Sequence, residues 1–99
     1  MVENMNIVMI SGKIISEVDF NFIYNKNKKE KHTSIAMCKL QLEDDSIIDV
    51  YGYDEVADYL YRNSNKYVYA EGRIDTNMMV EILKVEKLNF CDFTSLQNV

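Results

Sequence analysis

Lysines and tyrosines, rather than catalytic groups, are the side chains whose positions indicate chemistry. Five lysines and one acid lie between Asn25 and Lys39, and the whole chain holds seven tyrosines and four phenylalanines. Lysines neutralise the phosphates of a single strand, while aromatic rings stack on its bases. We therefore expect a surface for single-stranded nucleic acid. Its phosphate contacts would be Lys26, Lys28, Lys29, Lys31 and Lys39, and its stacking residues Tyr24, Tyr51 and Tyr69.

Charge is distributed unevenly along the chain. The net charge of −5 and the pI of about 4.7 argue against a polyanionic ligand. Residues 25–39, however, carry a net charge of +4, whereas residues 40–61 hold seven acids and no base. We expect nucleic acid to bind from the Lys26–Lys39 side, with the acidic side turned to solvent or a protein. A solvated loop is the alternative interpretation of the lysine run.

Catalytic and metal-binding patterns are missing from the sequence. It has no glycine-rich phosphate loop and no nucleophile with a histidine partner nearby, so we expect no enzyme, cofactor or metal site. The single histidine, His32, is expected in a loop. Cys38 and Cys91 are too few for a disulfide framework, which favours free thiols in a reducing cytoplasm. Apolar runs are far shorter than a membrane-spanning helix, and no export signal is visible.

Alternating apolar and polar residues dominate the chain and predict strands. The predicted strands cover residues 6–15, 33–42, 46–51, 67–74 and 78–88, with a further strand face formed by Phe20, Phe22 and Tyr24. The period changes once, where Val56, Tyr59 and Leu60 form the apolar stripe of a short helix. Asp54 is predicted to cap this helix through its carboxylate. Residues 63–65 are predicted to end it, because Asn accepts a left-handed conformation.

The element order places these strands in one all-β domain. Strand, strand, strand, short helix, strand, strand is the order of the OB-fold, a barrel that binds oligonucleotides or oligosaccharides. We therefore predict a five-stranded OB-fold barrel of antiparallel strands, with the helix between strands 3 and 4. The domain spans residues 1–99 with its core in residues 6–88, and the tail 89–99 is expected to pack on the body or on a second subunit.

Alternation also predicts which aromatic rings face outward. Tyr51 and Tyr69 lie opposite the apolar residues beside them, and are therefore expected outside the barrel core, where a ligand can reach them. Phe20 and Phe22 are expected in the core or in an oligomer interface, since aromatic residues contribute strongly to both.

Three short motifs resemble the bacterial single-stranded DNA-binding protein family. Ile10–Ile14, Val50–Gly52 and Val68–Ile74 are similar to its Ile-Gly-Arg-Leu, Ala-Trp-Gly and Val-Ala-Val-Glu-Gly-Arg-Leu patches, in the same order. The resemblance covers residues 6–88. It implies a domain that binds single-stranded DNA, or RNA, without strong sequence preference, in replication, recombination or repair. It also implies a homodimer or homotetramer, because the family pairs its first strands.

The resemblance adds candidate contacts. It places Tyr51 where the family has a stacking Trp, and Lys13 and Arg73 at basic positions on outward faces. A cross-strand ion pair with Glu71 or Asp49 is an equal alternative for these two cations. Asp49 shares the face of Tyr51, and its carboxylate would repel phosphate unless Lys39 or Arg73 neutralises it.

The sequence also departs from the family's pattern. It has no Pro after Glu17, where the family usually has Asp-Pro, and it has no Trp. Its hairpin after Ile74 is very short, where the family has a long arm. The family's acidic tail is missing too, so a small stand-alone or PriB-like member fits better, with replication or mobile-element proteins as partners. The rival function is an OB-fold protein-interaction module without nucleic-acid binding, which the acid-rich segment 40–61 favours.

Overall fold

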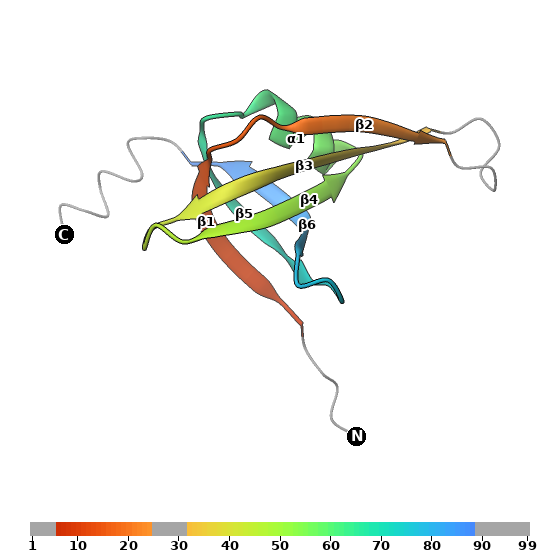
Figure 1. Ribbon diagram of the computed structural model, residues 1–99. Helices are drawn as coiled ribbons and strands as arrows, with labels where there is room; N and C mark the ends of the chain where they lie inside the picture. The colour runs from red at the N-terminus through yellow and green to blue at the C-terminus, as the bar shows by residue number, and fades with distance from the viewer. Residues whose placement is uncertain (1–5, 25–31, 89–99) are drawn as a thin grey trace, which may run out of the picture.

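The computed structural model describes residues 6–24 and 32–88, which form six strands and one helix (Figure 1). In chain order they are β1 (Val8–Ile14), β2 (Asp19–Tyr24), β3 (His32–Leu42), β4 (Ile47–Tyr53), α1 (Glu55–Arg62), β5 (Tyr67–Ile74) and β6 (Val80–Lys87). Every predicted strand is present, and the helix lies where the sequence period changes. β4 extends two residues beyond its predicted end, and β3 begins at His32, so His32 is a strand residue rather than a loop residue.

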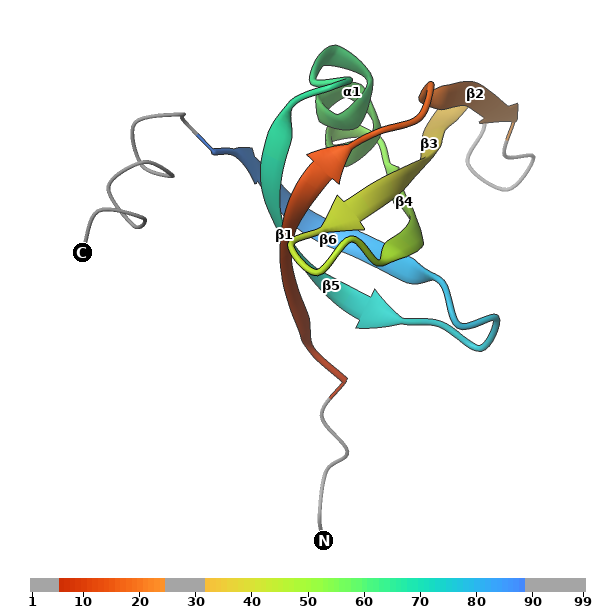
Figure 2. The same cartoon turned by 60° about the vertical axis from the view of Figure 1, so that its left-hand side comes forward.

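Five strands close into the predicted OB-fold barrel (Figure 2). Around the barrel the order is β1, β5, β6, β4 and β3, and β3 pairs again with β1. The pair that joins β4 to β6 is parallel, with Val50 beside Val80, whereas the other pairs are antiparallel. The prediction of five antiparallel strands is wrong for this one pair. It joins strands that are distant in sequence, and no hairpin dictates their direction.

β1 and β2 are two halves of the first barrel strand. Both pair with β3, with Ile14 opposite Leu40 and Asp19 opposite Met37. Four residues, 15–18, therefore face only two residues of β3, and this bulge bends the chain away from the barrel. Because this bulge divides the first barrel strand into β1 and β2, the structure has six strands where five were predicted. The helix, predicted between strands 3 and 4, therefore lies between β4 and β5 in this numbering. β2 pairs with β3 alone and is the edge of the sheet.

The core fills the barrel from alternate positions of every barrel strand. Val50 and Val68 are fully buried, while their strand neighbours Ile47 and Tyr67 remain about half exposed. The largest fully buried side chains are Ile14, Leu40, Leu60, Ile82, Val50 and Val68. Ala57 and Leu60 bury one side of α1, which therefore covers one end of the barrel (Figure 2).

The start of α1 differs from its prediction, whereas its end agrees. The Asp54 carboxylate makes no capping hydrogen bond; it accepts one from the backbone N of Ser34 in β3, 3.3 Å away, and so ties the helix start to the sheet. Asn63 ends the helix with φ −113°, and its backbone N–H donates to the carbonyls of Tyr59 and Leu60. Asn65, two positions later, takes the left-handed conformation that was predicted for an Asn of residues 63–65.

Candidate nucleic-acid interface

Four side chains on the outer surface of β3 and β4 form what we call the tyrosine face: Ile35, Met37, Tyr51 and Tyr53. Met37 lies opposite Tyr51 and Ile35 opposite Tyr53 in the strand register. Met37 is 39% exposed and Tyr53 40%, whereas the intervening Gly52 is buried. Alternation thus places two aromatic rings and two apolar side chains together on a surface open to a ligand.

Tyr51 is held in place on this face. Its ring meets that of Tyr53 edge to face, with 5.8 Å between centroids and an interplanar angle of 88°. Its hydroxyl donates a hydrogen bond of 2.7 Å to Oδ2 of Asp75, in the turn between β5 and β6. This hydrogen bond to a carboxylate, helped by desolvation, raises the pKa of Tyr51 to about 12. The outward position predicted for Tyr51 is confirmed.

Asp75 organises the turn that holds Tyr51. Its Oδ1 accepts hydrogen bonds from the backbone N of Asn77, at 2.8 Å, and of Met79, at 3.0 Å. Its own backbone N donates to the carbonyl of Met79, which closes the turn predicted after Ile74. The hydrogen bond from Tyr51, together with those from the backbone, lowers the pKa of Asp75. One carboxylate therefore serves both the turn and the ring.

Charged residues beside the tyrosine face are paired. Lys39 Nζ lies 2.8 Å from Asp49 Oδ1, and Arg73 Nη2 lies 3.0 Å from Glu81 Oε1. Lys39 therefore neutralises Asp49, one of the two possibilities that the sequence left open. Arg73 forms a cross-strand ion pair, but its partner is Glu81 rather than the predicted Glu71 or Asp49. An exposed pair such as Lys39–Asp49 contributes about 0–1 kcal/mol, so a phosphate can compete for Lys39.

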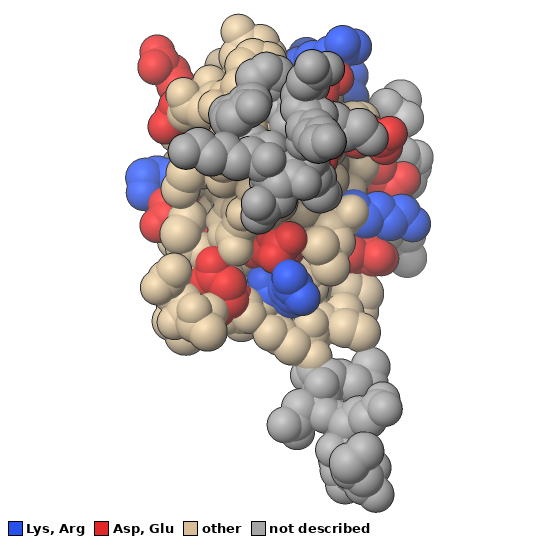
Figure 3. Space-filling view, turned by 90° about the vertical axis from the view of Figure 1, so that its right-hand side faces the viewer, with Lys and Arg blue, Asp and Glu red and all other residues tan. Residues whose placement is uncertain are grey.

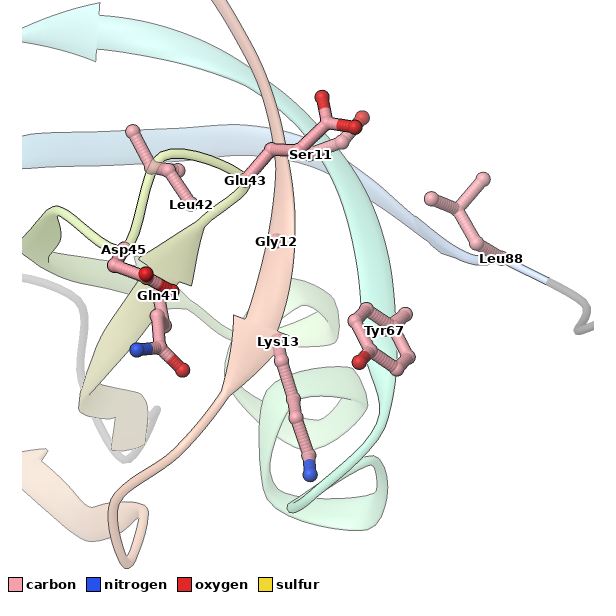
Figure 4. A pocket seen from close by; sticks show the side chains of 9 residues that line it. All are labelled: Ser11, Gly12, Lys13, Gln41, Leu42, Glu43, Asp45, Tyr67 and Leu88. Atoms are coloured by element: carbon pink, nitrogen blue, oxygen red, sulfur yellow. The ribbon is translucent and has the colours of Figure 1, made fainter. Parts of the chain in front are cut away.

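Lys13 and Tyr69 lie on a different outer surface, formed by β1 and β5, which we call the β1–β5 face. Lys13 is opposite Tyr67, and its Nζ lies 5.9 Å from the centre of that ring. The hydroxyl of Tyr69 donates to Glu71 at 2.8 Å, which raises the pKa of Tyr69. Figure 4 shows Lys13 and Tyr67 on neighbouring strands beside a pocket of about 220 Å³, with Gln41 across β1. The predicted stacking residues are thus divided between two faces.

The remaining predicted contacts belong to the hairpin between β2 and β3. Lys26, Lys28, Lys29 and Lys31 lie outside the described residues, and so does the side chain of Tyr24, whose backbone pairs with His32. On the face shown in Figure 3, basic and acidic side chains of the described residues lie next to one another rather than in separate patches. That arrangement agrees with the two ion pairs above.

Four residues of the tyrosine face and its support were not predicted as site residues: Ile35, Met37, Tyr53 and Asp75. Tyr53 follows Tyr51 by two positions, so extending the predicted strand by two residues would have found it. The positions of Met37 and Ile35 across from Tyr51 and Tyr53 depend on strand register, which the sequence does not reveal. The bond between Asp75 and Tyr51 joins residues 24 positions apart.

Other chemistry receives no support within the described ranges. No three His, Cys, Asp or Glu side chains of residues 6–24 and 32–88 come together as metal ligands. Cys38 is a free, buried thiol, and burial raises its pKa to about 11, so it stays protonated and unreactive. Cys91 lies outside the described residues. In the same part of the chain, no helix has the length and hydrophobicity needed to cross a membrane.

Solved structures with the same fold include several single-stranded DNA-binding proteins. The SSB domain of a Synechococcus protein has a TM-score of 0.64 at 19% identity, over 87% of this chain and 99% of that chain. The single-stranded DNA-binding protein of Thermus aquaticus has a TM-score of 0.65 at 19% identity; 86% of this chain matches 41% of that one. The dimeric N-terminal domain of PriB from Thermoanaerobacter tencongensis has a TM-score of 0.58 at 11% identity, over 85% and 97%.

At this level of identity the comparisons establish the fold, and they agree with the family resemblance drawn from the three motifs. No family model matches the sequence, and no curated protein sequence is similar to it. The fold is that of an OB-type barrel shared with single-stranded DNA-binding proteins. Binding proteins of this kind carry their ligand on the outer surface of the barrel sheet, which is where the tyrosine face lies.

Proposed function

We propose that the protein binds single-stranded DNA, or RNA, on the tyrosine face without strong sequence preference. The observation that carries the proposal is the pair Tyr51 and Tyr53, whose rings, the first half-buried and the second exposed, lie together on the outer surface of an OB barrel. Bases stack on such rings with about 1–3 kcal/mol each, whatever the base. The names of the structural neighbours support the same ligand class.

The cations around this face would contact the phosphates of the strand. Lys39 and Arg73 are each within reach of a backbone that passes Tyr51, and the hairpin lysines Lys26, Lys28, Lys29 and Lys31 supply the excess positive charge. Because the chain is acidic as a whole, binding should be weak at physiological salt and should strengthen as salt is removed. We also propose a homo-oligomer and an accessory role in DNA replication, recombination or repair.

Fluorescence anisotropy of a labelled oligo-dT in low salt tests the proposal. Binding that weakens steeply with added salt is expected, because released counterions drive it. Charge reversal at Lys28 and Lys29 should flatten that salt dependence. No binding at tens of micromolar protein in low salt would overturn the proposal.

A protein-interaction module is the second candidate, favoured by the acids that surround the rings. Glu17, Asp49, Asp75 and Glu81 all lie beside the tyrosine face or its flanking hollow. A protein partner that carries lysine or arginine would suit this rim, and the apolar Met37 and Ile35 would suit its core. Analytical ultracentrifugation with and without oligonucleotide separates the two functions. In an oligomer that assembles through the tyrosine face, Tyr51 and Tyr53 would become less exposed on assembly.

A further inference from the structure

The side of β2 that faces the helix carries an exposed aromatic cluster. Phe22 is 72% exposed and Tyr61, on α1, is 58% exposed, while Phe20 between them packs against the barrel core. The rings of Phe20 and Phe22 lie 5.3 Å apart at 82°, and those of Phe20 and Tyr61 lie 5.3 Å apart at 59°. We call Phe20, Phe22 and Tyr61 the β2 cluster. Core or oligomer interface was the prediction for both phenylalanines: Phe20 is half-buried against the core, whereas Phe22 is not in the core.

An exposed phenylalanine in such a cluster is poorly explained by folding. Burying a side chain of this size stabilises a protein by about 1.5–3 kcal/mol, and Phe22 gives up most of that. Its ring is nevertheless held edge-on by Phe20, an arrangement worth about 0.5–1.5 kcal/mol. A large apolar surface that is both exposed and positioned indicates a binding surface.

The cluster lies a short distance from the tyrosine face, around the edge of the sheet. Tyr53 on β4 pairs with Ile35 on β3, and Ile35 pairs with Asn21 on β2. Two strand spacings, about 10 Å, therefore separate the row of Tyr53 from β2. Phe22 is the residue after Asn21 and points to the opposite side of the strand. Because β2 has no further partner strand, a ligand can pass over its free edge.

We propose that the β2 cluster stacks a second base of the strand that lies on the tyrosine face, with the sugar-phosphate backbone crossing the edge of β2. The proposal rests on the proposed function. Residues 25–31, which follow β2 in the sequence, contain four lysines and one acid, a composition that favours a phosphate backbone. A hollow of about 460 Å³, lined by Glu17, Val18, Tyr61 and Ser64, gives the base room beside the ring of Tyr61.

Photocrosslinking identifies the stacked rings directly. An oligonucleotide of about 20 residues with scattered 5-iodouracil, long enough for more than one OB site, is irradiated with the full chain in low salt. Crosslinks are expected in two peptides, one holding Tyr51 and Tyr53 and one holding Phe20 and Phe22. An oligonucleotide of about 5 residues, which one stacking surface can fill, should crosslink at the tyrosine face alone.

Affinity measurements with Phe22→Ala give the second readout. We expect a loss of about fivefold or more for the long oligonucleotide, the lower limit of one stacked base, and no loss for the short one. Leu83→Ala is the matched control, because Leu83 is 58% exposed on β6, the strand beside β4, and lies outside the β2 cluster. Its removal should affect the long and the short oligonucleotide alike. Circular dichroism checks that both variants fold, which the exposure of both side chains favours.

Four results would overturn the inference. Crosslinks confined to the tyrosine face, or equal behaviour of Phe22→Ala and Leu83→Ala, would remove the second stacking site while the proposed function stood. A Phe22→Ala variant that dissociates an oligomer without losing affinity would assign the cluster to a second copy of the chain. Absence of any binding by the unmodified protein would overturn both the inference and the proposed function.

Discussion

The tyrosine face and the β1–β5 face contain the same hydrogen bond in two different settings. In each, a tyrosine hydroxyl donates to a carboxylate, Tyr51 to Asp75 at 2.7 Å and Tyr69 to Glu71 at 2.8 Å. Glu71 lies two residues from Tyr69 on the same strand, so that bond joins nothing distant. Asp75 lies in another hairpin and also accepts two backbone amides.

The difference shows what a surface hydrogen bond can do for a binding face. A bond within one strand leaves the ring as mobile as its strand neighbours, whereas a bond between two elements fixes the ring before a ligand arrives. Fixing a side chain beforehand removes part of the ordering cost of binding, which is about 0.5–1.5 kcal/mol for each immobilised side chain. We therefore expect Tyr51, rather than Tyr69, to be the first contact for a short strand.

The largest expected effect separates the two faces by affinity. Tyr51→Ala should weaken binding of a short oligo-dT by about 1–3 kcal/mol, at least about fivefold, because a stacked base loses its ring. Tyr69→Ala should leave the short oligonucleotide unaffected, because a strand on the tyrosine face does not reach the β1–β5 face. Anisotropy titrations of both variants with both lengths measure this. Equal losses on the short oligonucleotide would contradict the division into a first and a second face.

Two glycines test how firmly the strands of the two faces are held. A Cβ on Gly72 in β5 would overlap the backbone carbonyl of Glu81, while a Cβ on Gly52 in β4 would overlap the side chain of Val56 on α1. Overpacking usually costs about 1–3 kcal/mol, and a backbone atom yields less readily than a side chain. Gly72→Ala should therefore destabilise the protein more than Gly52→Ala.

Urea denaturation of these two alanine variants gives the order. Gly52→Ala is also expected to weaken oligonucleotide binding beyond its effect on stability, since α1 packs behind the strand that carries Tyr51 and Tyr53. A larger loss of stability for Gly52→Ala would show that the helix, and not the β5–β6 pair, is the more rigid support.

A smaller effect is expected from removing only the hydroxyl of Tyr51. Tyr51→Phe keeps the ring and loses the bond to Asp75, so affinity for short oligo-dT should fall by a few fold, less than in Tyr51→Ala. Tyr69→Phe, the control on the other face, should change nothing. If Tyr51→Phe binds as well as the unmodified protein, the bond to Asp75 does not contribute to binding.

The same bond predicts a dependence of stability on pH. Because its pKa in the folded protein is about 12 and its ordinary value is 10, neutral Tyr51 stabilises the fold below pH 10, and this contribution is lost as the pH rises toward 12. Asp75, whose pKa is lowered, contributes above its ordinary pKa and loses its contribution in acid. Absorbance titration of Asp75→Ala should show Tyr51 ionising nearer pH 10. An unchanged titration would contradict the assigned cause.

The smallest effect concerns the ion pair beside the tyrosine face. The coupling between Lys39 and Asp49 should be about 0.2–1 kcal/mol in a double-mutant cycle of stability, because both side chains are more than half exposed. Asp49→Asn should strengthen oligonucleotide binding slightly, since it frees Lys39 for a phosphate. The change should shrink with added salt. A weaker affinity in Asp49→Asn would indicate that the carboxylate itself contacts the ligand.

Local pattern in the sequence was enough to predict the fold. Alternation placed Val50 and Val68 inside and Tyr51 and Tyr69 outside, because a strand's two faces are fixed by a period of two. It did not predict the bulge at residues 15–18, since only the register against β3 reveals that four residues face two. The parallel pair of β4 and β6 was not predicted either, because it joins strands that are distant in sequence.

The candidate site was less predictable than the fold. Whether Tyr51 and Tyr69 share a surface depends on barrel closure. Phe22 follows the same alternation as Phe20, which packs against the core, yet Phe22 lies beyond the barrel. Hydrogen bonds such as Tyr51 to Asp75 join residues that no local pattern connects. Side-chain direction is thus local information, while the grouping of side chains into a site is not.

The short turn between β5 and β6 also has a kinetic consequence. A long arm that closes over a bound strand must open before the strand leaves. The turn after Ile74 closes with Asp75 and Met79, and residues 75–79 contain no such arm. Among the described residues no segment of β5, β6 or their turn encloses a strand on the tyrosine face, so we expect stacking and charge to hold it. Its dissociation should be a single step, so that each ring removed shortens the lifetime by a further factor and oligonucleotides exchange rapidly between molecules.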